Sequence, residues 1–190
     1  CGLGSEVTYI GAVGSGQEGV VHPVFAPLRG FCRRVIPTGP PSGTQCLEFD
    51  DGKLMLNETV AQQAVTWERI VAAAGLAELR RMFDNAGLIA VVNWSLLGGV
   101  PGIWRGLMRD VLPHLSRRPR RMVIDLADPN KRSDDDLRAA LEQLGALNHA
   151  APVTLCLNLN EAQRIDGVLG LGRRRGARGR RRRGARRDRL

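Results

Sequence analysis

The spacing of apolar residues changes along the chain, and the change predicts two kinds of structure. The first sixty residues are typical of β structure: residues 7–13 form a short apolar stretch that ends in glycines. Apolar and polar residues alternate over 44–56, which predicts a β-hairpin with a tight primed turn at Asp51-Gly52. Five prolines between these segments predict loops and at most a short helix.

From Trp67 onward, apolar residues recur at helical spacing, and these stretches alternate with short apolar runs. Ser133 followed by three aspartates is a strong helix start, because the serine can cap the helix and the acids face its positive end. Four helices are predicted: 67–83 with a kink after Gly75, 101–113, one from Ser133, and 160–169. Three strands are predicted at 88–93, 121–126 and 153–157, the first of them buried on both faces.

This alternation of strands and helices predicts an α/β fold with a mostly parallel sheet flanked by helices. Ligands of such sheets bind outside the carboxyl ends of the strands, so the residues after each strand are the first candidates for a site. These residues are Asn93, Trp94 and Ser95; Asp125, Asp128, Asn130, Lys131 and Arg132; and Asn158, Asn160 and Glu161.

Two of these segments carry most of the candidate chemistry. Residues 125–132 hold two carboxylates, an amide and two cations, and Asn158 lies three residues before Glu161. A carboxylate and an amide beside a phosphate suit Mg²⁺, which takes few protein oxygens, and Arg132 can meet phosphate oxygens in a bidentate fashion. The alternative is that Asp128-Pro-Asn130 is an ordinary turn and Asn158 a helix cap.

A glycine motif near the start has a different interpretation. Residues 14–19 spell G-x-G-x-x-G, but a dinucleotide site needs a helix to begin inside the motif and an acid about 20 residues later. Pro23 and Pro27 interrupt any such helix, and Arg33-Arg34 stand where the acid should be. A glycine-rich turn is therefore preferred to a dinucleotide site. The cysteines and histidines show no metal-ligand spacing, so a zinc site is not expected.

The net charge of +9 is concentrated at one end of the chain. Residues 173–190 contain 11 arginines and one acid, which leaves a net charge of −1 for residues 1–172. We expect residues 172–190 to be a disordered Arg/Gly-rich tail, because they have no periodic apolar face. With no run of about 18 apolar residues and no signal peptide at the start, a cytoplasmic protein without a membrane segment is predicted.

Several segments together resemble the ribokinase-type, or PfkB, carbohydrate kinases. The resemblance covers about residues 2–171. The segments that carry it are 3–14, Thr44 with 48–53, 92–94, 125–132 and 157–162. The glycine run from Gly11 to Gly19 has Gly16 where an Asp is usual, and the last segment includes the N-x-x-E element at Asn158 and Glu161.

The resemblance implies a ribokinase-like fold, incomplete at both ends, with a partial PfkB domain over 1–171 and a β lid formed by the 44–56 hairpin. It implies transfer of the ATP γ-phosphoryl group to a sugar hydroxyl with Mg²⁺, and a homodimer through the lid. The implied nucleotide and phosphate contacts are Asn158, Glu161, Asn130 and Arg132, with Glu161 also on the metal. The implied sugar contacts are Asn93, Asp125, Asp128 and Thr44.

The same resemblance predicts that this polypeptide alone is inactive. The resembled kinases take their catalytic base and anion hole from a G-A-G-D-like segment well after N-x-x-E, and these 190 residues contain none. Two other functions stay open: a non-catalytic pseudokinase, and non-specific nucleic-acid binding through the Arg-rich tail, which would weaken as salt rises.

Overall fold

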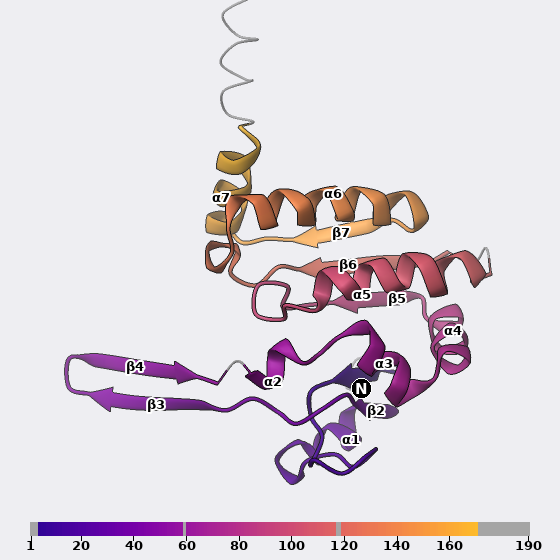
Figure 1. The fold of residues 1–190 in the computed structure, drawn as a ribbon, viewed down its shortest axis with the longest axis horizontal. Helices are drawn as coiled ribbons and strands as arrows, with labels where there is room; N and C mark the ends of the chain where they lie inside the picture. The colour runs from indigo at the N-terminus through magenta and orange to yellow at the C-terminus, as the bar shows by residue number, and fades with distance from the viewer. Residues whose placement is uncertain (1–3, 59, 117–118, 171–190) are drawn as a thin grey trace, which may run out of the picture.

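The parallel sheet predicted from the alternating pattern is present. The computed structural model describes residues 4–58, 60–116 and 119–170. Strands β5 (Leu88–Val91), β6 (Arg121–Asp125) and β7 (Val153–Cys156) lie parallel in the order β5-β6-β7 (Figure 1). The chain returns between them through α5 (Val100–Gly106) and α6 (Asp134–Ala150), which lie over the same face of the sheet.

Only one face of this sheet is covered by the described part of the chain. Ile89, Met122 and Ile124 point to the helices and are buried, whereas Leu88 on the other face is 60% exposed. The prediction of a first strand buried on both faces was therefore wrong. An apolar run alone does not reveal whether a second layer of helices lies against it.

The N-terminal region adds a second, smaller parallel pair. Strand β1 (Thr8–Gly11) pairs with β2 (Arg34–Pro37), and the short helices η1 (Pro23–Phe25) and α1 (Leu28–Phe31) lie between them in sequence. Strand β2, which ends in a proline, was not predicted from the sequence. Proline is tolerated here because each strand of a two-stranded sheet is an edge. No helix begins within the 14–19 glycine motif, where Gly14 instead bridges to Val21.

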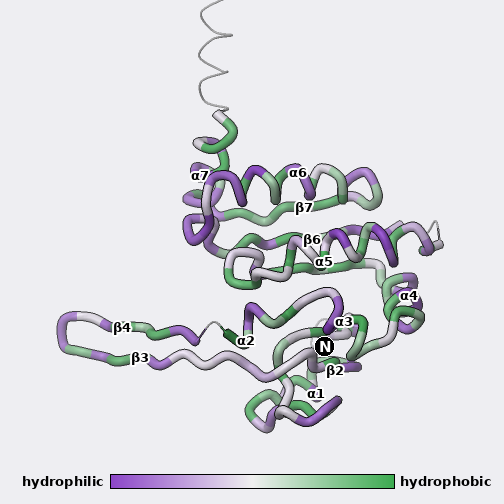
Figure 2. Tube along the Cα trace, in the orientation of Figure 1, coloured by the Kyte–Doolittle hydropathy of each residue, from purple (hydrophilic) through white to green (hydrophobic). Residues whose placement is uncertain are grey.

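The predicted hairpin is confirmed, but its turn differs from the prediction. Strands β3 (Thr44–Phe49) and β4 (Gly52–Asn57) pair with Phe49 opposite Gly52, so Asp50 and Asp51 form the turn, without the positive φ of a primed turn. This register places Glu48 opposite Lys53, a favourable cross-strand pair. The hairpin extends away from the rest of the molecule (Figure 1), with apolar stretches along both strands (Figure 2).

The helical stretch from Trp67 is broken as its sequence suggests. Helices α3 (Trp67–Ala74) and α4 (Leu76–Asn85) meet at Gly75, whose φ of 77° favours glycine. The short helix α2 (Val60–Gln63) precedes them, and α5 continues into a π-helical turn, η2 (Leu107–Val111), and a 3₁₀ turn, η3 (Leu112–His114).

Trp67 joins these helices to α5 and η2. Its indole Nε1–H donates to Asp110 Oδ2 at 2.8 Å, and Arg109 Nη2 lies 2.5 Å from the same oxygen. Hydrogen bonds from Arg109 and then Trp67 hold the pKa of Asp110 at about 2. Gly106 packs so closely against the Trp67 ring that an added Cβ would overlap it.

The last helices begin at side-chain caps. Ser133 Oγ accepts from the N–H of Asp136 at 3.1 Å, which confirms the predicted start of α6. Helix α7 (Leu159–Leu169) follows β7 and begins at a cap on Asn158. No helix within the described ranges is long and apolar enough to cross a membrane. The predicted tail over 172–190 lies outside the described residues.

Replacing Gly106 by alanine should destabilise the protein, because the new methyl group must displace the indole of Trp67. We expect a loss of about 1–3 kcal/mol of unfolding free energy in urea. Gly145→Ala in α6 is the matched control: no heavy atom lies near its Cβ position, so alanine should stabilise the helix by about 0.5–1 kcal/mol. A Gly106→Ala variant as stable as the wild type would contradict this packing.

Candidate functional site

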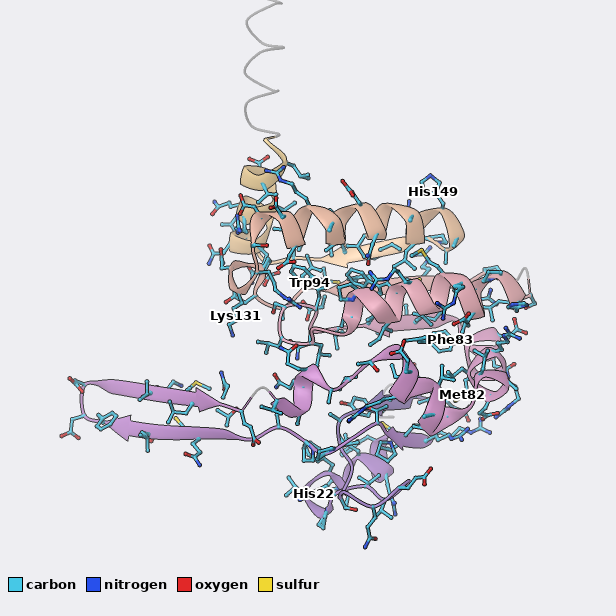
Figure 3. All side chains as sticks on the ribbon, viewed as in Figure 1. His22, Met82, Phe83, Trp94, Lys131 and His149 are labelled. Carbon is cyan, nitrogen blue, oxygen red and sulfur yellow. The ribbon has the colours of Figure 1, made fainter. Side chains whose placement is uncertain are left out.

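The carboxyl ends of β5, β6 and β7 lie at one edge of the sheet, and polar residues follow each strand there. Val91 pairs with Ile124, and Asp125 pairs with Cys156, so the three strands end in register. Trp94, after β5, and Lys131, after β6, lie at this same end of the sheet (Figure 3). The structure thus brings together the segments that the sequence analysis selected.

The loop after β5 is tied to the loop after β6. Asn93 has a φ of 68°, a left-handed conformation that asparagine adopts more readily than most residues. Trp94 and Ser95 follow and are buried. The backbone N–H of Ser95 donates to the carbonyl oxygen of Leu126 at 3.1 Å, and Ser95 Oγ accepts from the N–H of Asp128 at 3.1 Å. These bonds fix the two loops relative to each other.

Both carboxylates of the 125–132 segment shape their own turns. Asp125 Oδ1 accepts from the N–H of Ala127 at 2.8 Å, and Ala127 has a φ of 56°. Asp128 Oδ1 accepts from the N–H and the side-chain amide of Asn130, each at 3.1 Å, and caps the 3₁₀ turn η4 (Pro129–Lys131). The turn interpretation of this segment is correct, and it leaves one oxygen of each carboxylate outside these bonds.

Arg132 is held at this edge without a carboxylate beside it in the described ranges. Its Nη2 donates to the carbonyl oxygen of Trp94 at 3.4 Å, and its Cζ lies 5.2 Å from the centroid of the Trp94 ring. Its Nε is buried and has no hydrogen-bond partner there. By contrast, nearby Arg164 of α7 pairs with Asp134 at 2.6 Å and donates to the carbonyl oxygen of Arg132 at 3.4 Å.

Asn158 and Glu161 form a capping box at the start of α7. The N–H of Glu161 donates to Asn158 Oδ1 at 3.0 Å, while Glu161 Oε2 accepts from the N–H of Asn158 at 3.0 Å and Oε1 accepts from its Nδ2 at 2.5 Å. The cap at Asn158, which was the alternative interpretation of this residue, is present. A carboxylate and an amide oxygen also fit Mg²⁺, which would compete with these bonds for the Glu161 oxygens.

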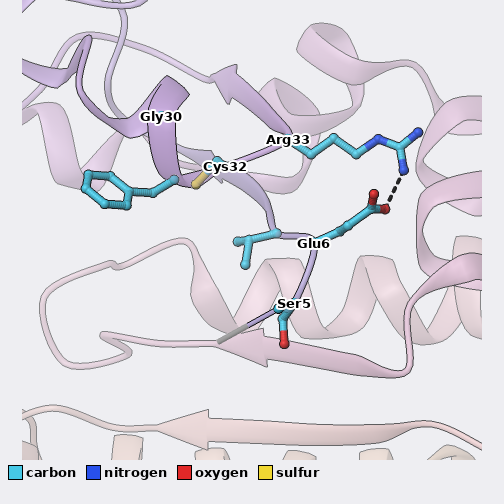
Figure 4. Close-up of a pocket in the computed structure, with 8 residues that line it drawn as sticks. Ser5, Glu6, Gly30, Cys32 and Arg33 are labelled. Atoms are coloured by element: carbon cyan, nitrogen blue, oxygen red, sulfur yellow. Dashed lines mark hydrogen bonds and ion pairs between the residues drawn. The ribbon is translucent and has the colours of Figure 1, made fainter. Parts of the chain in front are cut away.

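Thr44 does not join this cluster. It begins β3, and its Oγ1 donates to Asn57 Oδ1 across the hairpin at 2.9 Å. A separate shallow hollow of about 320 Å³ lies between residues 4–7 and 30–33 (Figure 4). An exposed ion pair between Glu6 and Arg33 lines it, and none of the predicted site residues does.

Two residues at the edge were not assigned a role from the sequence. Trp94 was singled out for its place after the first strand and as part of the 92–94 segment of the resemblance, but without a role, and Arg164 was not singled out. The sequence does give a signal for Trp94, because it is a large aromatic residue in a polar loop directly after a strand. It gives no signal for Arg164, because no local pattern pairs Arg164 with Asp134 or places Arg164 next to Arg132.

The family of the chain follows from sequence comparison. The sequence model described as prokaryotic ketohexokinase matches residues 1–181. The chain belongs to the prokaryotic ketohexokinase family. A ketohexokinase of Haloferax volcanii is 35% identical over 133 residues, which are 70% of this chain and 36% of that protein. The chain thus spans about a third of the length of this curated relative. No solved structure matches significantly.

Membership of the ketohexokinase family confirms the carbohydrate-kinase part of the resemblance found in the sequence. The narrower assignment to the ribokinase type, and the role of each site residue, stay predictions. The structure does support an α/β architecture with a parallel sheet, flanking helices and a small antiparallel hairpin.

In this ketohexokinase-family chain, stability measurements can separate the capping role of the N-x-x-E pair from its charge. Asn158→Ala should lower the unfolding free energy by about 1 kcal/mol, because the first turn of α7 loses its side-chain acceptor. Glu161→Gln should change it far less, since glutamine also serves in a capping box. Equal losses in urea unfolding for both variants would contradict this assignment.

Proposed function

We propose that this chain carries the phosphate-binding sheet edge of a ketohexokinase of the PfkB type, which transfers the γ-phosphoryl group of ATP to a hydroxyl group of a ketohexose. Family membership supports the sugar kinase. The observation that carries the site is the Arg132 guanidinium, which no described carboxylate pairs at the edge where α/β sheets bind ligands. A partly buried cation of this kind is stabilised by an anionic ligand.

The residues divide into two groups by chemistry. Arg132 and Asn130 can donate to phosphoryl oxygens, and Asn158 and Glu161 would hold Mg²⁺ beside them. When bound there, Mg²⁺ would supply positive charge that neutralises the phosphate groups of ATP. The sugar hydroxyls are assigned to Asn93 and to the oxygens of Asp125 and Asp128 that lie outside the turn hydrogen bonds. Thr44, which lies on the hairpin apart from this cluster, would reach the sugar only through the proposed lid.

The 190 residues do not supply every part that the transfer needs. Phosphoryl transfer requires a base on the acceptor oxygen and amide donors for the transferring group. No G-A-G-D-like segment occurs in this sequence, so we expect the 190-residue polypeptide alone to show no turnover.

The hairpin is proposed to cover the sugar and to contact a second copy of the chain. Every residue of β3 and β4 is exposed. Four apolar side chains share one face of the hairpin and are 46–61% exposed: Leu47, Phe49, Leu54 and Leu56. Covering this face would remove their apolar surface from water.

The proposed function can be tested in two proteins by measuring ADP formation from Mg-ATP and fructose. The purified 190-residue chain should form no ADP above background. A chimera, in which the matching residues of this chain replace those of the Haloferax volcanii ketohexokinase, should form ADP only when the ketohexose is present. In the chimera, Arg132→Gln should lower kcat/KM about a hundredfold, because a charge that meets the transferring group is lost.

Arg138→Gln is the matched control, since Arg138 is exposed on α6 and belongs to none of the ion pairs described. It should leave kcat/KM unchanged, and circular dichroism should show both variants folded. A folded Arg132→Gln chimera with full activity would contradict the phosphate site. Sugar-dependent turnover by the 190-residue chain would instead contradict the expectation that it lacks a base.

A further inference from the structure

We propose that Trp94 is a positioning residue that holds the guanidinium of Arg132 ready for an anionic, phosphoryl-type ligand. This inference rests on the proposed function, because it concerns the same sheet edge. It adds a residue with no charge and no place in the N-x-x-E element.

Trp94 contacts Arg132 in two ways. The Arg132 Cζ lies 5.2 Å from the Trp94 ring centroid, within the range in which the aromatic face attracts a cation. The carbonyl oxygen of Trp94 also accepts from Arg132 Nη2 at 3.4 Å. Together these contacts restrict a long side chain that would otherwise sample many rotamers.

Trp94 is itself firmly placed. Its side chain is only 1% exposed. The residue before it, Asn93, sets the chain direction with a φ of 68°, and the residue after it, Ser95, donates to the carbonyl oxygen of Leu126 at 3.1 Å. A buried ring fixed on both sides provides a rigid platform, which favours binding because little freedom is lost when a ligand arrives.

Each residue of this pair has a hydrogen-bond donor without an acceptor among the described residues. Both Arg132 Nε and Trp94 Nε1 are buried and have no acceptor in the part of the chain that the structure describes. A buried donor without an acceptor is unfavourable, so a ligand whose oxygens reach the charged guanidinium of Arg132 would stabilise it. A triphosphate offers both the negative charge and the oxygens.

The test uses the full 190-residue chain labelled with ¹⁵N and inorganic triphosphate as the probe. Binding is followed by NMR at the Nε–H of Arg132, assigned from its loss in Arg132→Lys, so that anion binding elsewhere on the chain does not enter the measurement. The wild-type signal should shift and saturate. Trp94→Leu should weaken the apparent affinity on the order of tenfold, and Trp94→Phe, which keeps an aromatic face, roughly threefold.

Trp104→Phe is the matched control, because Trp104 is also buried, has an unpartnered Nε1 and lies in the core. It should leave the affinity unchanged, while amide spectra report whether each variant is folded. If the wild-type signal responds but both Trp94 variants bind as wild type, the positioning role is overturned and the proposed function stands. If the wild-type signal does not respond, the phosphate role of Arg132 is overturned as well. Where Trp94→Leu does not fold, the affinities of Trp94→Phe and Trp104→Phe are compared. Weaker binding by Trp94→Phe alone supports the positioning role, and equal affinities overturn it.

Discussion

The candidate site depends on the parallel register of β5, β6 and β7. Because the three strands end at one edge, residues that are up to 68 positions apart in sequence, from Asn93 to Glu161, reach one region of the surface. Among the described residues, this register is stabilised from one side: Met122 and Ile124 of the central strand are fully buried on the face covered by α5 and α6. The polar edge therefore owes its geometry to an apolar core that carries none of its chemistry.

Much of the fold could be predicted from local patterns. Ser133 with its three aspartates placed the start of α6, and alternation placed the hairpin, because both signals act over a few residues. Apart from the turn of the hairpin, the errors concern interactions with distant partners. Strand β2 exists because it pairs with β1, and the exposed face of β5 reflects what does not cover it in the described ranges. Neither the pairing of β2 nor the exposure of β5 can be predicted from the residues of the strand alone.

The candidate site shows the same difference between what local sequence indicates and what depends on contacts between distant residues. The proposed location of the site after the strands follows from topology, and so does the presence of Asn158, Glu161 and Arg132 at one edge. The state of each side chain does not: the Glu161 carboxylate is already engaged with Asn158, whereas Arg132 faces an indole instead of an acid. A cap and a metal ligand call for the same residue types, so the sequence alone cannot rank them.

The hairpin has a consequence for how such a protein can change over generations. All of its strand residues are exposed and none belongs to the buried core cluster, so its shape rests on its own cross-strand pairs. Substitutions in the hairpin should therefore have little effect on the stability of the rest of the fold and should affect mainly the molecules that contact the hairpin. Under the proposed lid role, selection could adjust ligand preference or self-association through β3 and β4 while the sheet stays constant.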